Sequence, residues 1–273
     1  SYAPSDPFFI GQRLFVFQRT DTATPELWLA DQNTGAPVAG PLPDNGLGLP
    51  TLVIDGGSPL DLVDLAGPDW NPANANEIAY ALGTGIDFQT LPPALTVQGD
   101  IYRFRVDLGL PGAARITNLR NDGTEGGFYP DYNQDGDTVV FSHIDMNFFN
   151  ALDPFAAFDL STVDVATQAL TRPNIPYPDG QNRAELMPVF SPRGDRIAFA
   201  GILFDLGTGT FASDIWVADA TGGVAIRATN TLNEFELYPV FSEGPALIAR
   251  QSDSANGNTR GQTIPYPVGG INP

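Results

Sequence analysis

One pattern recurs along the chain at intervals of about 50 residues: an apolar or aromatic residue, a proline, a short strand, a turn and a second strand. The prolines Pro130, Pro188 and Pro239 fall in register in the three clearest copies. In chain order, the five copies are DPFFIGQRLFVFQ (6–18, the weakest), PDWNPANANEIAYAL (68–82), FYPDYNQDGDTVVFSH (128–143), LMPVFSPRGDRIAFAG (186–201) and LYPVFSEGPALIARQ (237–251). Such a repeat predicts several similar units, each too small to bury its apolar surface alone.

A second module follows the first after a gap of variable length. Its copies are PELWLADQNTG (25–35), GDIYRFRVDLG (99–109), FDLSTVDVATQ (158–168) and SDIWVADATGG (213–223). A short third segment then ends in a threonine-asparagine or threonine-arginine pair, in ARITN (114–118), ALTRP (169–173) and AIRATN (225–230). Apolar residues alternate along many of these segments, which is the period of a strand. Each unit therefore reads as strand, tight turn, strand, variable loop, strand, turn, strand.

Four-stranded antiparallel units in tandem are the signature of a β-propeller. The sequence predicts an all-β protein, a single propeller domain over residues 1–273 with four-stranded antiparallel blades. Five copies predict five blades, with repeats at approximately 6–60, 61–118, 127–173, 185–230 and 236–273. Six blades are the alternative, because residues 51–65 lie outside the repeat frame. The last unit has weak outer strands, and residues 1–6 are candidates to complete it.

The motif P-x-F-S-P-x-G-x-x-I-A-F followed by D-I-W-V-x-D-x-x-G-G, best formed at residues 188–223, resembles the repeat of TolB-type propellers, a WD-repeat-like family. Degenerate forms cover nearly the whole chain. The resemblance implies a periplasmic or extracellular bacterial propeller that binds other proteins. Related repeats also form the propeller domains of prolyl-oligopeptidase-like hydrolases. TolB carries an additional N-terminal domain for which these 273 residues have no room, so the two proteins are not equated.

The composition excludes several kinds of partner and site. There are 32 acidic residues against 13 basic ones, all arginine, and the net charge is −19. A nucleic-acid partner is not expected, since phosphate binding needs clustered positive charge, and anionic membranes are disfavoured for the same reason. With no cysteine and one histidine, disulfides and multi-histidine metal sites are excluded. No apolar run is long enough for a membrane-spanning helix. No secretory leader opens the chain, as expected of a processed exported protein or a trimmed fragment.

The gaps between the second and third strands are unusually apolar. They are the segments 81–99, 142–158 and 201–213, and in a propeller they project on one face, here called the insertion rim. One interpretation is that their side chains cap the propeller's own core. The other is an exposed apolar patch that docks onto a partner protein. The partner-binding candidates are Phe88, Leu91, Met146, Phe148, Phe149, Leu152, Phe155, Phe204 and Phe211.

Catalytic motifs are sparse, and the chain is not predicted to be an enzyme. A G-x-S-x-G elbow is absent from the sequence, so no hydrolase nucleophile is indicated. A Ser-His-Asp arrangement would have to use His143, which directly follows a predicted strand and is interpreted as structural. Carboxylate pairs for glycoside hydrolysis can be drawn from the many acidic residues, but nothing singles one out. The alternative function is a glycosidase-like or esterase-like hydrolase with its site in the central channel.

A possible calcium site lies in the third repeat. Asp131, Asn133, Asp135 and Asp137 resemble the first half of an EF-hand loop, with Gly136 at the glycine position. Position 12 of such a loop is Ser142 instead of glutamate, and the flanking segments are strands. The repeat register also places Gly136 opposite Gly194, where a hairpin turn favours glycine. The turn is therefore the first interpretation and Ca²⁺ the second; no other cofactor is expected.

Aspartates recur at strand ends, as Asp31, Asp164 and Asp219, and are expected to accept hydrogen bonds from backbone amides of the next turn. Taken together, the sequence predicts a non-catalytic, exported propeller of a bacterium. It would act as a binding or scaffold protein, an accessory subunit of a larger envelope or membrane-associated complex. Docking would use the insertion rim, and no transmembrane segment is expected.

Overall fold

The computed structural model describes residues 14–19, 26–31, 34–42, 67–74, 76–84, 98–105, 113–119, 124–149, 154–205, 210–230, 234–241, 246–253 and 258–265. The regular elements in these ranges are strands, apart from two short 3-10 helices, η3 (Met146–Phe148) and η4 (Pro154–Ala157). No helix in the described ranges is long and apolar enough to cross a membrane.

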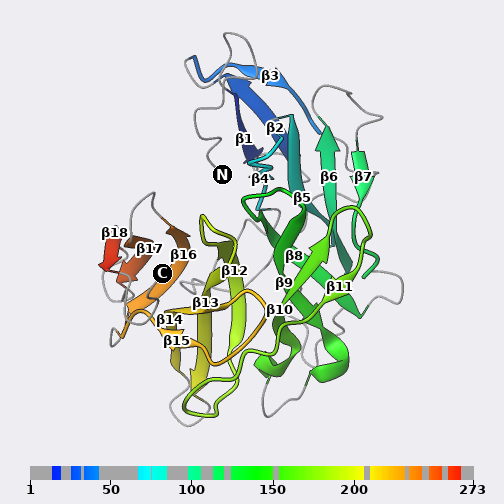
Figure 1. Ribbon diagram of the computed structural model, residues 1–273. Coiled ribbons are helices and arrows are strands. Elements are labelled where there is room, and N and C mark those ends of the chain that lie inside the picture. The colour runs from blue at the N-terminus through cyan, green and yellow to red at the C-terminus, as the bar shows by residue number, and fades with distance from the viewer. Residues whose placement is uncertain are drawn as a thin grey trace.

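The strands form successive antiparallel units that lie side by side in an arc (Figure 1). Units 2, 3 and 4 have the predicted four strands each, paired in chain order. Their bounds are β4 (Asp69–Trp70), β5 (Glu77–Thr84), β6 (Gln98–Arg105) and β7 (Ala113–Arg115) in unit 2; β8 (Glu125–Tyr132), β9 (Thr138–Asp145), β10 (Phe158–Asp164) and β11 (Leu170–Thr171) in unit 3; β12 (Ala184–Phe190), β13 (Arg196–Asp205), β14 (Thr210–Asp219) and β15 (Ile226–Arg227) in unit 4.

Units 1 and 5 each have three strands within the described ranges. They are β1 (Leu14–Arg19), β2 (Glu26–Asp31) and β3 (Pro37–Ala39) in unit 1, and β16 (Glu234–Phe241), β17 (Ala246–Asp253) and β18 (Asn258–Pro265) in unit 5. Single parallel bridges join unit 2 to unit 3 (Gly99 with Gly126) and unit 4 to unit 5 (Ser213 with Phe235). The first strands β8, β12 and β16 contact one another in sequence, as neighbouring blades require.

The hydrophobic core lies between the units, because each sheet buries its faces against its neighbours. One cluster joins units 1 and 2 and includes Leu27, Leu29 and Tyr80. The largest cluster joins units 2, 3, 4 and 5, and a further one packs unit 3 against Phe199 and Trp216 of unit 4. The fold is therefore stabilised by contacts between repeats, as the repeat pattern predicts.

The recurrent proline marks a backbone irregularity at or just before the first described strand of units 2 to 5. The residues before it, Gly67, Tyr129, Met187 and Tyr238, all have positive φ, between 45° and 55°. In β8, β12 and β16 the strand register shifts across this step, which makes a β-bulge. A left-handed non-glycine residue costs on the order of 1 kcal/mol, so the repeated conformation is maintained by its surroundings.

Two aspartates after this step connect successive units. Asp69 accepts a hydrogen bond from Tyr132 N (3.0 Å), and Asp131 accepts one from Phe190 N (2.7 Å). Burial raises the pKa of Asp69 to about 6 and holds that of Asp131 well above its usual range, where the charge of Asp69 adds to the effect. Both carboxylates thus act as acceptors between neighbouring first strands.

The hairpin turns of units 3 and 4 confirm the turn interpretation of Gly136 and Gly194. Their φ angles are 68° and 70°, in the left-handed region that favours glycine. Gly136 N donates to Asn133 O, and Gly194 N donates to Ser191 O. The two turns differ in their surroundings. A Cβ on Gly136 would overlap the amide of the buried Asn71, whereas one on Gly194 would meet only Asn133 Cβ at 3.6 Å.

This difference makes a matched pair of substitutions. Gly194→Ala should lower the free energy of unfolding by about 1 kcal/mol, the penalty of a left-handed alanine. Gly136→Ala should lower it by about 3 kcal/mol, because Asn71 must also leave its bonds to Glu77 Oε1 and Gly136 O. Urea denaturation of both variants measures the difference. Equal losses would contradict the assigned packing of Asn71 on the turn.

Candidate functional site

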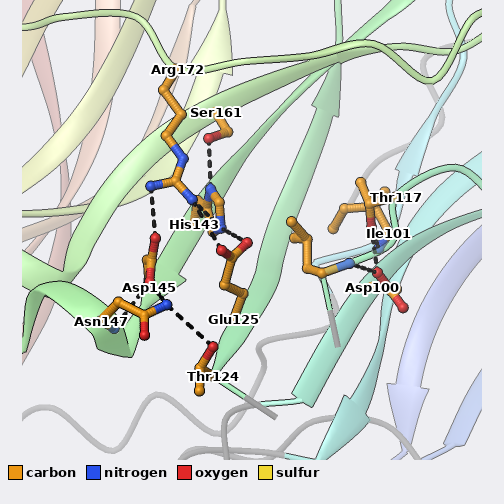
Figure 2. A network of polar contacts seen from close by, with 11 residues as sticks. Asp100, Ile101, Thr117, Thr124, Glu125, His143, Asp145, Asn147, Ser161 and Arg172 are labelled. Atoms are coloured by element: carbon orange, nitrogen blue, oxygen red, sulfur yellow. Dashed lines mark hydrogen bonds and ion pairs between the residues drawn. The ribbon is translucent and has the colours of Figure 1, made fainter. Parts of the chain in front are cut away.

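A polar clasp holds the outer strand in unit 2. Asp100 is fully buried and accepts a hydrogen bond from Thr117 Oγ1 at 2.8 Å (Figure 2) and one from Leu119 N at 2.7 Å. Arg115 lies 3.3 Å from its second oxygen. Thr117 Oγ1 in turn accepts from Ile101 N at 2.9 Å. The clasp replaces strand pairing where the outer strand is short.

Unit 4 repeats most of this arrangement at equivalent positions. Asp214 pairs with Arg227 at 2.5 Å, and Thr229 Oγ1 accepts from Ile215 N at 2.8 Å. The aspartate is again buried. Two units therefore use an aspartate and arginine pair with a threonine two residues after the arginine.

Unit 3 departs from this pattern at the insertion rim. Asp159 occupies the aspartate position but is exposed, and its side chain makes no hydrogen bond or ion pair within the described ranges. Arg172 occupies the arginine position, one residue beyond the pairing of Thr171 with Thr162, but is bonded elsewhere. Asn174 stands where the threonine would be, and Leu160 N donates to Glu185 Oε2 of unit 4 (3.1 Å) in place of the threonine.

Arg172 binds a group of side chains that unit 3 alone provides (Figure 2). Its guanidinium lies 2.8 Å from Asp145 Oδ2, 3.5 Å from Glu125 Oε1 and 3.3 Å from His143 Nε2. His143 Nε2 also lies 3.2 Å from Glu125 Oε2, and its Nδ1 lies 2.8 Å from Ser161 Oγ. Ser161 occupies the place of Tyr102 and Trp216 in the neighbouring units, and the smaller side chain leaves room for the imidazole.

A chain of contacts runs through Ser161, His143 and Glu125, which are residue types found in hydrolytic triads. Their burial instead indicates a structural role. Ser161 is 0% exposed and His143 1% exposed. Burial, followed by the charge of Arg172, lowers the pKa of His143 to about 3, so the ring is neutral at physiological pH. A neutral ring is satisfied in either tautomer, through Glu125 and Ser161 or through Ser161 and Arg172. The arrangement fixes β9, β10 and the segment after β11 to one another.

The same network positions an exposed aromatic ring. Asp145 is the N-cap of η3 and accepts from Asn147 N (3.0 Å), while its other oxygen binds Arg172. Phe148, at the end of η3, is 56% exposed, and the Arg172 guanidinium lies 5.9 Å from its ring centroid. The flanking Met146 and Phe149 are partly buried and pack against the core. Met146 and Phe149 therefore cover the core, whereas Phe148 is exposed, and docking of this segment onto a partner stays a prediction.

The other partner-binding candidates are only partly covered by the structure. Phe88, Leu91 and Leu152 lie outside the described residues. Phe155 is in η4, and the positions of Phe204 and Phe211 pair with each other in a long hairpin of β13 and β14. The expected loop at 201–213 is thus mostly regular strand. The described ends of the three apolar segments do lie along one edge, as the Gly99 to Gly126 bridge and the pairing of Ala184 with Ile202 show.

The residues of the suggested calcium loop take separate positions. Asp131 contacts the next unit through Phe190 N, while Asn133 Oδ1 accepts from Asp137 N and Thr138 N within the turn. Asn133 Nδ2 donates to Asp137 Oδ1 at 2.8 Å, and Asp135 is exposed. Within the described ranges, no group of three or more His, Cys, Asp or Glu side chains is placed to hold a metal ion. Calcium binding by these residues stays a prediction.

The strand-end aspartates largely behave as expected. Asp31 Oδ1 accepts from Thr34 N (2.9 Å), and Asp164 Oδ1 accepts from Thr167 N (2.7 Å), which confirms the local turn bonds. These bonds hold the pKa of Asp164 below its usual range. Asp219 differs, because its carboxylate lies 3.7 Å from Arg196 Nε.

Sequence reasoning did not identify the departure of unit 3. The aligned modules carry the signal, because Ser161 replaces the aromatic residue of GDIY and SDIW. In addition, Asn174 replaces the threonine that stands two residues after the arginine in units 2 and 4. His143 was interpreted as structural, and its burial and contacts agree with that interpretation.

No protein-family model matches the chain, and no curated protein matches it. Solved structures do resemble it. An oligogalacturonate lyase from Vibrio parahaemolyticus aligns with a TM-score of 0.52 and 12% identity, over 92% of this chain and 59% of its own. A TolB-like protein from Agrobacterium tumefaciens aligns with a TM-score of 0.51 and 14% identity, over 92% of this chain and 80% of its own.

The propeller domain of the Trilobed protease from Pyrococcus furiosus aligns with a TM-score of 0.47 and 8% identity, over 93% of this chain and 65% of its own. This chain spans 59% of the length of the lyase. The similar structures include both enzymes and TolB-like proteins. At these identities the likeness concerns the fold alone. The all-β chain has the β-propeller fold.

Proposed function

We propose that the protein is a non-catalytic β-propeller binding protein that docks onto a protein partner through its insertion rim. Units 1 to 5 would be five blades of one ring, and the protein would act outside the bacterial cytoplasm as an accessory subunit of an envelope or membrane-associated complex. The observation that carries the proposal is Phe148, a large apolar side chain that is 56% exposed while its neighbours Met146 and Phe149 pack inward. Aromatic side chains, phenylalanine among them, are enriched at protein–protein interfaces relative to the rest of the surface.

The chemistry around Phe148 supports binding over catalysis. Ser161 and His143 are buried, so neither the hydroxyl nor the imidazole reaches a substrate. The carboxylates Asp145 and Glu125 are already paired with Arg172. The hydrolase with a channel site stays an alternative prediction, for which no carboxylate pair is singled out. Asp69 and Asp131, whose pKa values are raised, each have one oxygen bonded to the next unit.

Phe148→Ser should abolish co-purification of a partner from native membranes, because it removes the exposed ring without disturbing the core. Leu170→Ser is the matched control. Leu170 is also exposed, at 41%, but it lies in β11 near the opposite end of the same unit. Both variants should retain the wild-type melting temperature to within about 2 °C, as surface substitutions do.

A photo-crosslinking phenylalanine analogue at position 148 should trap the same protein that Phe148→Ser loses, and the analogue at position 170 should not. Mass spectrometry of the crosslinked peptide identifies the partner. Equal recovery of that protein with Phe148→Ser and Leu170→Ser would contradict the proposed docking site.

A further inference from the structure

The departure of unit 3 from the repeat leaves one carboxylate available at the insertion rim. In units 2 and 4 the equivalent Asp100 and Asp214 are buried and paired with arginine. Asp159 is exposed, and within the described ranges its side chain makes no hydrogen bond or salt bridge, although the charges of Arg172 and Asp145 act on it. Arg172, which would pair with it under the repeat pattern, is directed to Asp145 and Glu125.

The charges around Asp159 favour a cation. Glu125, Asp145 and Asp159 face the single guanidinium of Arg172, and His143 is neutral. Partial removal from water raises the pKa of Asp159; the charge of Arg172 lowers it, and that of Asp145 raises it further. An added positive charge would offset this excess of negative charge. The chain as a whole, at −19, would also steer a basic partner toward it.

The geometry favours an organic cation over a metal ion. The described ranges contain no group of three or more His, Cys, Asp or Glu side chains placed to hold a metal. The Arg172 guanidinium instead connects the acidic group to the exposed Phe148 ring, 5.9 Å away. Arginine and lysine carry both a charged head and an apolar stem, which fits a group of carboxylates and an aromatic ring that contact the same guanidinium.

We propose that Asp159, the first residue after the apolar segment 142–158 that carries Phe148, receives a basic side chain of the protein partner, an arginine or lysine flanked by an apolar residue. This rests on the proposed docking function and specifies the chemistry of the partner. Asp159 of unit 3 then recognises the partner, while the buried, arginine-paired Asp100 and Asp214 stabilise units 2 and 4.

The test uses a fluorescein-labelled octapeptide of alternating leucine and arginine, with a leucine and glutamine octapeptide as neutral control, in fluorescence anisotropy at low ionic strength. The wild-type protein should bind the arginine peptide and not the neutral one. Asp159→Asn should weaken binding roughly fivefold or more, the effect of removing one close charge pair at a partly exposed site. Asp159→Glu, which keeps the charge, should stay within about threefold of wild type.

Asp219→Asn is the control, since it removes the same charge from an exposed aspartate at the C-terminal end of β14 in unit 4, whereas Asp159 lies near the N-terminal end of β10 in unit 3. It should change the affinity by less than about twofold, because the charge lies far from the peptide. Equal weakening by Asp159→Asn and Asp219→Asn would overturn the inference and attribute binding to the overall charge. The inference would also be overturned if 1 mM CaCl₂ displaced the peptide from wild type and Asp219→Asn but not from Asp159→Asn. That result would indicate a metal site at Asp159.

The two proposals fail separately. Crosslinking of a partner at residue 148 would support the docking function. If Asp159→Asn then had no effect on peptide binding, the proposed basic ligand would be rejected while the docking function was retained. A selective effect of Asp159→Asn with no crosslink specific to residue 148 would leave a cation-binding site and reject the proposed docking surface.

Discussion

Replacing Asp100 with alanine should lower the free energy of unfolding by about 3 to 5 kcal/mol. The carboxylate is fully buried and accepts from Thr117 Oγ1 and Leu119 N. Its removal leaves both donors without an acceptor, and the Arg115 guanidinium loses its partner. Each unsatisfied buried group costs about 1 to 3 kcal/mol.

The equivalent position in the next unit provides the control. Asp159→Ala should change the free energy of unfolding by less than about 0.5 kcal/mol, since the side chain is exposed and accepts no bond in the described ranges. Asp100→Asn should be intermediate, because one amide oxygen can still accept from Thr117 and Leu119. Urea denaturation at pH 7 compares the three variants. Similar losses for Asp100→Ala and Asp159→Ala would show that the clasp does not hold unit 2.

The repeat made the fold predictable because a propeller blade is specified locally. The in-register prolines and the alternation of apolar residues identify the order of strands, and units 2, 3 and 4 have that order. The positive φ of Tyr129, Met187 and Tyr238 was not predictable in the same way. A hydrophobic period reports which face a residue occupies, and it carries no information on a left-handed step before proline.

The candidate site was less predictable because it depends on an exception to the repeat. An apolar run does not distinguish a side chain that caps the core from one that faces solvent, and Met146 and Phe148 differ in this respect although they are two residues apart. Similarly, Asp100, Asp159 and Asp214 look alike in sequence. Their different environments follow from the side chains near them, in particular from Ser161, two residues after Asp159, where the neighbouring units have an aromatic ring.

Glu185→Gln should stabilise the protein at pH 8 by a few kcal/mol and flatten its stability between pH 5 and pH 8. Glu185 is buried, accepts from Tyr177 Oη (2.9 Å) and Leu160 N (3.1 Å), and burial with the charge of Asp159 raises its pKa from 4.5 to about 8. The folded state therefore binds a proton that the unfolded state has released between pH 4.5 and about 8. Over that window stability falls as the pH rises, by up to about 1.4 kcal/mol per pH unit.

Asp69 contributes in the same direction between pH 3.8 and about 6, so the wild-type protein should be most stable in mildly acidic solution. Glutamine removes only the Glu185 part. Its oxygen can accept from Leu160 N and its amide can donate to Tyr177 Oη, so the packing is retained. Thermal unfolding of wild type and Glu185→Gln at pH 5, 6, 7 and 8 and constant ionic strength measures the difference in slope.

Two further variants separate this effect from the general repulsion of a chain with a net charge of −19. Asp179→Asn should leave the slope between pH 5 and 8 unchanged, since the hydrogen bond from Arg183 holds the pKa of the largely exposed Asp179 at about 2. Asp159→Asn should flatten the slope in part, because the charge of Asp159 contributes to the raised pKa of Glu185. If stability fell with pH as steeply in Glu185→Gln as in wild type, another group would be responsible for the pH dependence. Glu185 would then accept from Leu160 N as an ionised carboxylate.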